Sequence, residues 1–438
     1  MKTQEIVKKY IEQHQLLHPE GRYLVAVSGG ADSVCLLLLL QRLGYHVEAV
    51  HCNFHLRGDE SNRDEDFVKQ LCKDNNIILH LTHFYTTEYA NIHKVSIEMA
   101  ARELRYRYFE QLRCDLGYQD VCVAHHSDDN VETVLMNLLR GTGIRGLQGI
   151  QPRNGHIVRP LLCISRTDIE AWLAAHQASY ITDSTNLKDD ILRNHLRLNI
   201  IPMLRQMVPA ASQNISATIR RMSEALKVYD AATTDALQQL GAHKGVVDIA
   251  QLSHEPSPES LLFEWLSPCG FNGITIENIS QHLDNPQSGR LWSSDTHDVC
   301  IHRGQLLLCL RHSVLPTLRV PEPGTYVYTE KQKYRFSIVD EWAISRHSHT
   351  ATLDADAVQF PLTIRPVQEG DRFTPYGMKG SKLVSDFLTD RHVSVIEKRR
   401  QLVVVDAEDH IVWLVGHRPD AHFCITDDTK KALVIQRC

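Results

Sequence analysis

A glycine-rich hexapeptide between an expected strand and an expected helix constrains this chain more than any other feature. Residues 28–33 read Ser-Gly-Gly-Ala-Asp-Ser, directly after the apolar run Tyr23–Val27 and directly before the apolar run Val34–Leu43. A turn that opens a helix offers unpaired backbone N–H groups at the positive end of the helix dipole, and adjacent glycines let the backbone approach a phosphate closely. The hexapeptide therefore predicts a phosphate-binding loop, with a serine-capped helix that binds no ligand as the alternative.

Two better-known phosphate loops do not fit this segment. A Walker loop needs Lys directly before Ser or Thr, and a dinucleotide fingerprint needs Gly-x-Gly-x-x-Gly. Residues 28–33 match neither pattern. The hexapeptide instead resembles the pyrophosphate-binding loop of the N-type ATP pyrophosphatases, Ser-Gly-Gly-x-Asp-Ser. This resemblance implies an enzyme that splits ATP between the α and β phosphates and adenylates a carbonyl oxygen.

The composition is that of a globular protein with more than one domain. At 438 residues the chain is too long for one compact core, so we expect two to three domains. No apolar run reaches the roughly 18 residues of a membrane span, and the charged start of the chain does not read as a signal peptide, so no membrane partner is expected. The 11 cysteines are scattered, odd in number and partly inside apolar segments, which favours buried reduced thiols and a cytoplasmic location, and they include no Cys-x-x-Cys pair.

The distribution of charge matters more than its sum. A formal net charge of −6 counts mildly against a nucleic-acid partner. However, the stretch from Thr133 to Thr167 contains no Asp or Glu and several arginines. These are Arg140, Arg145, Arg153, Arg159 and Arg166. This stretch is either a solvated basic face or part of a nucleic-acid-binding surface, and the sequence leaves both interpretations open.

Short apolar runs alternate with helical patterns between residues 22 and 125, which predicts a parallel sheet with helices on both faces. The expected strands are Tyr23–Val27, His46–His51, Ile77–Leu81 and Val121–Ala124, and the expected helices are Val34–Leu43, Ser61–Asn75 and Glu98–Leu116. The pattern is mostly helical from about residue 166 to residue 240, with helices expected at Arg166–His176, Asn194–Met207 and Ala217–Leu226 and breaks around Pro202 and Pro209, and it becomes strand-like beyond residue 299. The predicted organisation is an α/β catalytic domain (1–215), a small helical substrate-binding domain (216–310), a connecting segment (311–360) and an α+β C-terminal domain (361–438).

A second polar segment follows the last of these expected strands. It reads His125-His126-Ser127-Asp128-Asp129-Asn130-Val131-Glu132-Thr133. Because ligands of parallel sheets bind at the carboxyl ends of strands, this segment and the hexapeptide can face one crevice. Asp129 and Glu132 are three residues apart and share a helix face, where they could complement the helix dipole, hold Mg²⁺ or bind an ammonium group. Zinc is a weaker option for His125 and His126, because no further ligand motif is evident.

With both segments in view, the chain resembles the tRNA(Ile)-lysidine synthases, a family of pyrophosphatase-loop ATPases. The matching strings are residues 28–33, His51–Arg57, Glu98–Tyr106, His125–Thr133, Arg140–Leu147, Asp183–Asn186, Arg193-Asn194, Arg197 and Gly370–Phe373. The match is strong over about residues 20–205 and resumes from residue 370 to residue 413. The C-terminal domain (361–438) is expected to bind tRNA, through cations such as Lys379, Lys382 and the cluster Lys398-Arg399-Arg400. The resemblance implies that ATP adenylates the C2 oxygen of the wobble cytidine in tRNA(Ile) with a CAU anticodon, and that the ε-amine of free lysine then displaces AMP.

The same resemblance implies roles for individual residues. The expected nucleotide-binding residues are Ser28, Gly29, Gly30, Ala31, Asp32, Ser33 and His125. The expected catalytic residues are Asp32, Asp129, Glu132 and Arg105, with Asp32 and Asp129 as ligands of Mg²⁺. Asp129 and Glu132 would receive the lysine ammonium, and Arg105 would bind the lysine carboxylate or a phosphate.

Three other functions were weighed against the residues. A tRNA thiolase of the same superfamily needs a cysteine persulfide or an iron–sulfur cluster, and the lack of Cys-x-x-Cys argues against it. A small-molecule amide ligase would need a nucleophilic N-terminal Cys or an amidotransferase domain. A non-catalytic RNA-binding protein with a degenerate loop is disfavoured by the intact Asp32, Asp129 and Glu132. The sequence leaves the oligomeric state open.

Overall fold

The computed structural model describes residues 2–182, 192–311, 315–330, 332–345 and 347–438. The chain divides into two compact units, Met1–Tyr229 and Asp230–Cys438. The Asp183–Asn186 string lies outside the described residues. The four-part division expected from the sequence is finer than these two units and stays a prediction.

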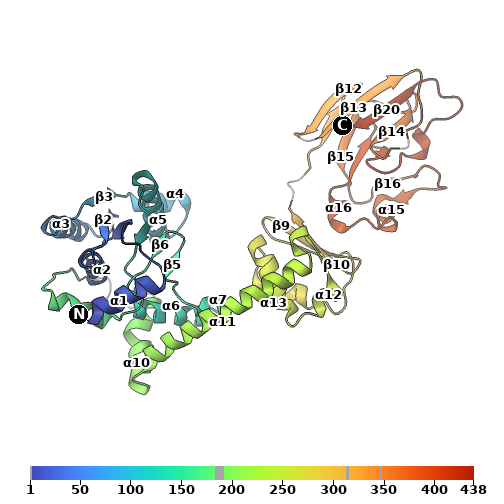
Figure 1. Cartoon of the computed structure of the whole chain (residues 1–438). Helices are drawn as coiled ribbons and strands as arrows, with labels where there is room; N and C mark the ends of the chain where they lie inside the picture. The colour runs from blue at the N-terminus through green and yellow to red at the C-terminus, as the bar shows by residue number, and fades with distance from the viewer. Residues whose placement is uncertain (1, 183–191, 312–314, 331, 346) are drawn as a thin grey trace. The chain divides into compact units, whose positions relative to one another are not determined.

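A six-stranded sheet forms the centre of the first unit, in the order β3-β2-β1-β4-β6-β5 (Figure 1). All pairs are parallel except the edge pair of β5 with β6. The strands are β1 (Arg22–Ala26), β2 (His46–Asn53), β3 (Leu79–His83), β4 (Asp120–Cys122), β5 (Arg153–Asn154) and β6 (Ile157–Val158). The predicted α/β class with a parallel sheet is confirmed, and the expected strands correspond to β1–β4 with slightly different ends.

Helices cover both faces of this sheet, as expected. The helices that begin in the first unit are α1 (Lys2–Gln13), α2 (Ala31–Arg42), α3 (Asp59–Asp74), α4 (Thr86–His93), α5 (Ile97–Leu116), α6 (Ser127–Leu139), α7 (Gly143–Leu147), α8 (Arg166–Ala175), α9 (Leu192–His195), the π-helix η2 (Leu196–Ile200), α10 (Ile201–Met207) and α11 (Ala211–Gln239), the last of which ends in the second unit. Along the central strand β1, Tyr23 and Val25 face a core shared with α2 and α8, whereas Leu24 faces a core shared with Phe109 of α5. A strand covered on both faces must be apolar at successive positions, which is why β1 reads as a continuous apolar run.

The helix expected over Asn194–Met207 forms in three consecutive pieces: α9, η2 and α10. Pro202 does not end this helix: it lies in the first turn of α10, directly after the π-helical turn Leu196–Ile200. Arg197 lies in the π-helical piece. Single π-helical turns occur frequently at functional sites, so this segment draws attention to that arginine.

The second unit contains three four-stranded antiparallel sheets and one small two-stranded sheet. The first sheet has the order β7-β10-β9-β8 and packs with short helices. Its elements are η3 (Ala242–Lys244), β7 (Val246–Asp248), α12 (Ile249–Ser253), α13 (Pro258–Leu266), η4 (Ser267–Cys269), α14 (Gly273–Ser280), β8 (Leu291–Ser293), β9 (His297–His302) and β10 (Gln305–Leu310). The region expected to be a small helical domain is therefore mixed: its helices pack with a four-stranded antiparallel sheet.

The remaining sheets run in the orders β11-β15-β18-β19, β12-β13-β20-β14 and β16-β17. Their elements are β11 (Leu318–Val320), β12 (Gly324–Thr329), β13 (Gln332–Val339), β14 (Thr350–Asp354), β15 (Leu362–Pro366), β16 (Arg372–Phe373), β17 (Lys382–Leu383), α15 (Val384–Asp390), α16 (Val395–Arg399), β18 (Leu402–Val405), β19 (Ile411–Leu414), η5 (Ala421–Phe423) and β20 (Ala432–Arg437). The segment expected to connect two domains (311–360) instead supplies the strands β11–β14. Alternate side chains of this segment, such as Tyr334 and Phe336, are buried in the same core as residues beyond 361.

Among the described helices, none combines the length and the apolar character needed to cross a bilayer.

Candidate functional site

The glycine-rich loop leaves β1 and enters α2 through an unusual backbone turn. Gly29 has φ +93°, a conformation that side chains other than hydrogen disfavour, and its carbonyl accepts a hydrogen bond from the Ile181 N–H at 2.9 Å. Ser33 closes the loop on itself, because its hydroxyl donates to the Gly30 carbonyl at 2.9 Å and accepts from the Ser28 N–H at 3.1 Å. The loop is therefore held in place before any ligand binds.

A cavity of about 260 Å³ opens beside this loop, at the carboxyl ends of β1, β2 and β4. It is lined by Ala26, Val27, Ser28, Gly30, Asp32, Ser33, Val50, Cys52, Phe54, Arg102, Arg105, Tyr106, Phe109, Val123, Ala124 and His125. Two expected nucleotide-binding residues are not in its wall: Gly29 shapes the turn, and Ala31 is buried in α2. The cavity combines apolar walls with a polar mouth, as small-molecule sites do.

Helix α5 contributes the cations of this cavity. The Arg105 guanidinium lies 5.1 Å from the ring centre of Phe54, and the Arg102 guanidinium lies 5.0 Å from the ring centre of Tyr106. Sequence analysis proposed Arg105 but missed Arg102 and Tyr106. Their spacing with Phe109 follows the i, i+3, i+4, i+7 pattern of one helix face, which was the available signal. Arginine side chains at this position suit phosphate oxygens.

Asp32 lies in the first turn of α2 with one oxygen held and the other open. Its Oδ2 accepts a hydrogen bond from Arg166 Nη1 at 2.7 Å, and its buried Oδ1 has no hydrogen-bond partner among the described residues. Burial raises the pKa of Asp32, although His126 and Arg166 act in the opposite direction. A buried carboxylate oxygen without a partner is a rare feature and indicates a place for a cation or a hydrogen-bond donor.

Asp129 and Glu132, on α6, form a second cluster with two arginines from the 192–207 segment. Glu132 accepts from Arg193 Nε at 2.7 Å and from Arg197 Nε at 2.6 Å, and Asp129 Oδ1 accepts from Arg193 Nη2 at 2.9 Å. Glu132 is 1% exposed, so these bonds compensate a buried charge. Burial alone would raise the pKa of Asp129, but His126 and Arg193 outweigh it and lower that pKa.

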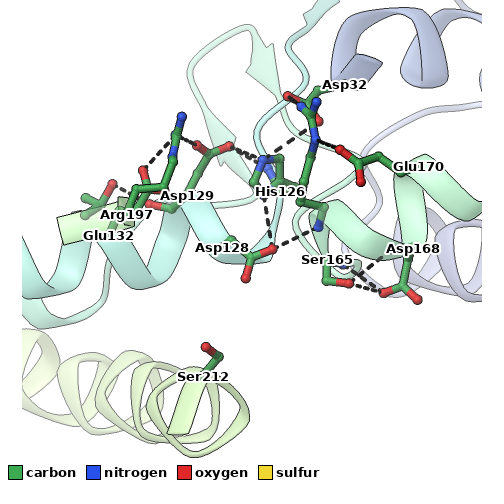
Figure 2. A network of polar contacts seen from close by, with 12 residues as sticks. Asp32, His126, Asp128, Asp129, Glu132, Ser165, Asp168, Glu170, Arg197 and Ser212 are labelled. Atoms are coloured by element: carbon green, nitrogen blue, oxygen red, sulfur yellow. Dashed lines mark hydrogen bonds and ion pairs between the residues drawn. The ribbon is translucent and has the colours of Figure 1, made fainter. Parts of the chain in front are cut away.

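The two histidines between β4 and α6 differ in role. His125 lines the cavity, and burial lowers its pKa to about 4, so its ring is neutral at pH 7. His126 is buried and joins the two clusters, since its Nε2 lies 3.8 Å from Asp32 Oδ1 and 3.4 Å from Asp129 Oδ2. Figure 2 shows His126 between Asp32 on one side and Asp129 with Glu132 on the other. Neither Asp129 nor Glu132 lines the cavity itself.

Magnesium fits Asp32 better than it fits Asp129. The described residues contain no group of three or more His, Cys, Asp or Glu side chains arranged to hold a metal alone. Mg²⁺ commonly binds through one or two carboxylates together with substrate phosphates, and the free Oδ1 of Asp32 meets that requirement. Both oxygens of Asp129 already accept hydrogen bonds, from Arg193 and from the His126 N–H.

Sequence reasoning missed most of the arginines that complete the site. Arg193 and Arg197 were noted only as part of the family resemblance, and Arg166 only as part of a basic stretch. A four-residue spacing of arginines in a predicted helix was the one local signal for the first two. Their carboxylate partners lie more than 60 positions earlier in the chain, so no local pattern could pair them.

The chain is similar to known proteins over almost its whole length. Family models match it as a PP-loop domain over residues 2–204, a TilS substrate binding domain over 242–311 and a TilS substrate C-terminal domain over 362–435. A tRNA(Ile)-lysidine synthase of Bacteroides thetaiotaomicron is 44% identical, covering 98% of this chain and 99% of the relative. Its counterpart in Parabacteroides distasonis is 43% identical over 98% of each chain, and that of Porphyromonas gingivalis W83 is 38% identical over 98% of this chain and 97% of the relative.

Proposed function

The chain belongs to the tRNA(Ile)-lysidine synthase family, and on that basis we propose that it is an ATP-dependent ligase that joins lysine to C2 of the wobble cytidine in tRNA(Ile) with a CAU anticodon. In the first step, the C2 oxygen attacks the α phosphorus of ATP, and pyrophosphate leaves. In the second step, the ε-amine of lysine attacks C2 and loses a proton, and AMP leaves with the former C2 oxygen. The substrates are ATP, lysine and tRNA(Ile), and the proposed location is the cytoplasm.

One observation carries this proposal: the loop cluster at Asp32 and the acidic cluster at Asp129 and Glu132 meet at the single side chain of His126. An enzyme that adenylates a base and then adds an amine needs an anion site and a cation site next to each other. Placing both reactants in one site converts a bimolecular encounter into a local event. The arrangement of the two clusters supports such a division of labour.

The loop supports the first half-reaction. The Ser28 hydroxyl and the N–H groups at the start of α2 are donors beside the cavity, where the charge of departing pyrophosphate would develop, and Ser33 shapes the loop by donating to the Gly30 carbonyl. Arg105 adds a fixed positive charge from α5. His125, neutral at pH 7, contributes hydrogen bonding without charge. Asp32 would hold Mg²⁺, which when bound offsets the repulsion between the phosphates and polarises them.

The acidic cluster supports the second half-reaction. Glu132 and Asp129 together bind nitrogen-bearing cations at 2.6–2.9 Å, which is the chemistry a lysine ammonium requires. Arg193 and Arg197 occupy these oxygens in the structure, so we propose that lysine exchanges with part of their hydrogen bonding. A carboxylate beside the amine can also take its proton, since only the neutral amine is nucleophilic.

The test is to incubate the full-length protein with tRNA(Ile), ATP and isotope-labelled lysine, and to analyse the tRNA by mass spectrometry. We expect one labelled lysine per tRNA at the wobble cytidine, with one AMP and one pyrophosphate released. Sulfur incorporation in the presence of a sulfur donor would indicate a thiolase instead. Binding of tRNA with no turnover of ATP would indicate a non-catalytic RNA-binding protein. Either result would refute the proposal.

A further inference from the structure

Arg166 does not line the cavity, yet among the described residues it makes the shortest contact with the carboxylate of Asp32. Its Nη1 donates to Asp32 Oδ2 at 2.7 Å, and its Nε donates to Glu170 Oε1 at 2.8 Å. The guanidinium is therefore fixed between two carboxylates, one from α2 and one from α8. A planar group with donors on two edges is well suited to hold another group in a defined orientation.

Asp128 fixes the backbone of the same arginine. Its Oδ2 accepts from the Arg166 N–H at 2.8 Å, and its Oδ1 accepts from Arg205 Nη2 at 2.7 Å. Arg205 Nε in turn donates to Ser212 Oγ on α11 at 2.8 Å. Figure 2 shows Asp128 below His126 and beside Ser165, the residue that caps α8. Asp128 thus ties the start of α8 to α6 and, through Arg205, to α10.

We propose that Arg166 is a positioning residue for adenylation, which holds Oδ2 of Asp32 so that Oδ1 alone stays available to a cation, and that Asp128 positions Arg166. This inference rests on the function proposed above. Without Arg166, the neighbouring cation of Asp32 would be His126, whose Nε2 lies 3.8 Å from Oδ1. The carboxylate of Asp32 could then rotate. A misplacement of about 1 Å at a reacting centre can cost roughly 100-fold in rate.

Loss of the Arg166 charge should raise the affinity of Asp32 for a cation and lower the rate of adenylation. Removing the Arg166 charge strengthens the attraction between Asp32 and a divalent cation, because the carboxylate no longer shares its charge. The same change lets the carboxylate leave its productive orientation. In Arg166→Gln we therefore expect kcat for tRNA-dependent ATP–pyrophosphate exchange to fall roughly 10- to 100-fold with the KM for ATP changed less than about threefold. We expect Mn²⁺, used as a probe for Mg²⁺ in the presence of a non-hydrolysable ATP analogue, to bind at least about threefold more tightly.

Three further variants separate positioning from folding. Arg166→Lys keeps the charge but cannot contact both carboxylates, so it should restore normal Mn²⁺ affinity and only part of the rate. Glu110→Gln weakens an Arg–Glu ion pair of the same kind, with Arg113 on α5, whose residues do not line the cavity, and serves as the matched control, with rate and Mn²⁺ affinity within about threefold of the unsubstituted protein. Asp128→Asn should lower kcat by a smaller factor than Arg166→Gln, again with little change in KM.

The inference is overturned if Arg166→Gln keeps the kcat of the unsubstituted protein. It is equally overturned if the rate, the Mn²⁺ affinity and the melting temperature all fall together, because this pattern describes a structural arginine. Failure of the proposed function looks different: the unsubstituted protein itself would then show neither exchange nor lysine incorporation. If it shows exchange without lysine incorporation, the exchange assay still tests Arg166.

Discussion

At the scale of single residues, Asp32 combines a burial-raised pKa with one oxygen that has no hydrogen-bond partner among the described residues. Asp32→Asn keeps the shape and removes the charge, so it should reduce tRNA-dependent ATP–pyrophosphate exchange by at least about 100-fold through lost cation positioning. The tRNA affinity, measured by filter binding, should stay within about twofold, because Asp32 lies inside the cavity and not on the surface. Exchange at near-normal rate would assign the cation elsewhere.

Substitution of Glu132 should impair the use of lysine more than the use of ATP. Glu132→Gln removes the charge that binds the cations of the second cluster, and we expect the KM for lysine to rise at least about 10-fold with the KM for ATP changed less than about threefold. The melting temperature should also fall, because Arg193 and Arg197 lose a buried charge partner. Steady-state kinetics with each substrate varied gives the answer. Equal losses for ATP and lysine would point to Mg²⁺ binding by Glu132 instead.

His125 predicts a specific pH dependence of stability. Its folded pKa of about 4 lies below the unfolded value near 6.5, so the unfolded state binds the proton first as the pH falls. The contribution of His125 to the unfolding free energy is therefore nearly constant above about pH 6.5. Lowering the pH from 7 to 5 should reduce the unfolding free energy by about 2 kcal/mol through this residue. Urea unfolding of the wild-type protein and of His125→Gln at these two pH values measures the difference. Identical pH slopes for the two proteins would contradict the assignment.

At the scale of elements, the glycine-rich loop offers a matched pair of substitutions. A Cβ at Gly29 would force a φ of +93° on an alanine and lie 3.3 Å from Ile181 Cδ1, whereas a Cβ at Gly30 would meet only Ser28 Oγ at 3.5 Å. Gly29→Ala should therefore lower the unfolding free energy by about 1–2 kcal/mol more than Gly30→Ala. Gly30→Ala should instead weaken ATP binding, because the methyl group enters the cavity. Denaturant titration and ATP binding distinguish the two; equal destabilisation would show that the turn tolerates a side chain.

The sequence predicts elements well where their boundaries are chemically marked. The helix expected at Glu98–Leu116 is α5, because Ser96 caps its start by accepting the Met99 N–H and Gly117 ends it at φ 71°. In contrast, β7 and β8 are three residues each, too short for an alternating pattern to be recognised. The long helix α11 exceeds the expected Ala217–Leu226 in both directions, and its last turns pack Ala236 and Leu237 against the core of the first sheet of the second unit.

The same contrast applies to the site. Residues 28–33 and 125–133 are contiguous, so the strand-turn-helix context of each could be read directly. The contacts that complete the site are non-local: Arg166 reaches Asp32, and Arg193 and Arg197 reach Glu132, only after the sheet has brought the carboxyl ends of its strands together. A single sequence contains no signal for such pairs, since each arginine alone is indistinguishable from a surface residue.

At the scale of the whole molecule, the expected tRNA binding by the C-terminal region is better tested by substitution than by truncation. A truncation near Asp356 would remove β20, which pairs with both β13 and β14, so the remaining strands would lose their sheet. Substitution of exposed cations leaves the fold intact. Lys379 and Arg399 are exposed, and no ion pair is recorded for either among the described residues, whereas Lys382 is paired with Asp390.

We therefore expect the double variant Lys379→Gln with Arg399→Gln to bind tRNA(Ile) more weakly. The slope of log affinity against log salt should become shallower by about 1 to 2, because binding with fewer phosphate contacts releases fewer counterions. ATP binding should be unchanged, since the cavity residues all lie before residue 126. The matched control is Lys431→Gln, which removes an exposed cation paired with Asp340. Filter binding over a series of salt concentrations provides both quantities. If the double variant kept the wild-type affinity and salt slope, the tRNA-binding surface would have to be sought on other cations, beginning with the arginines between Thr133 and Thr167.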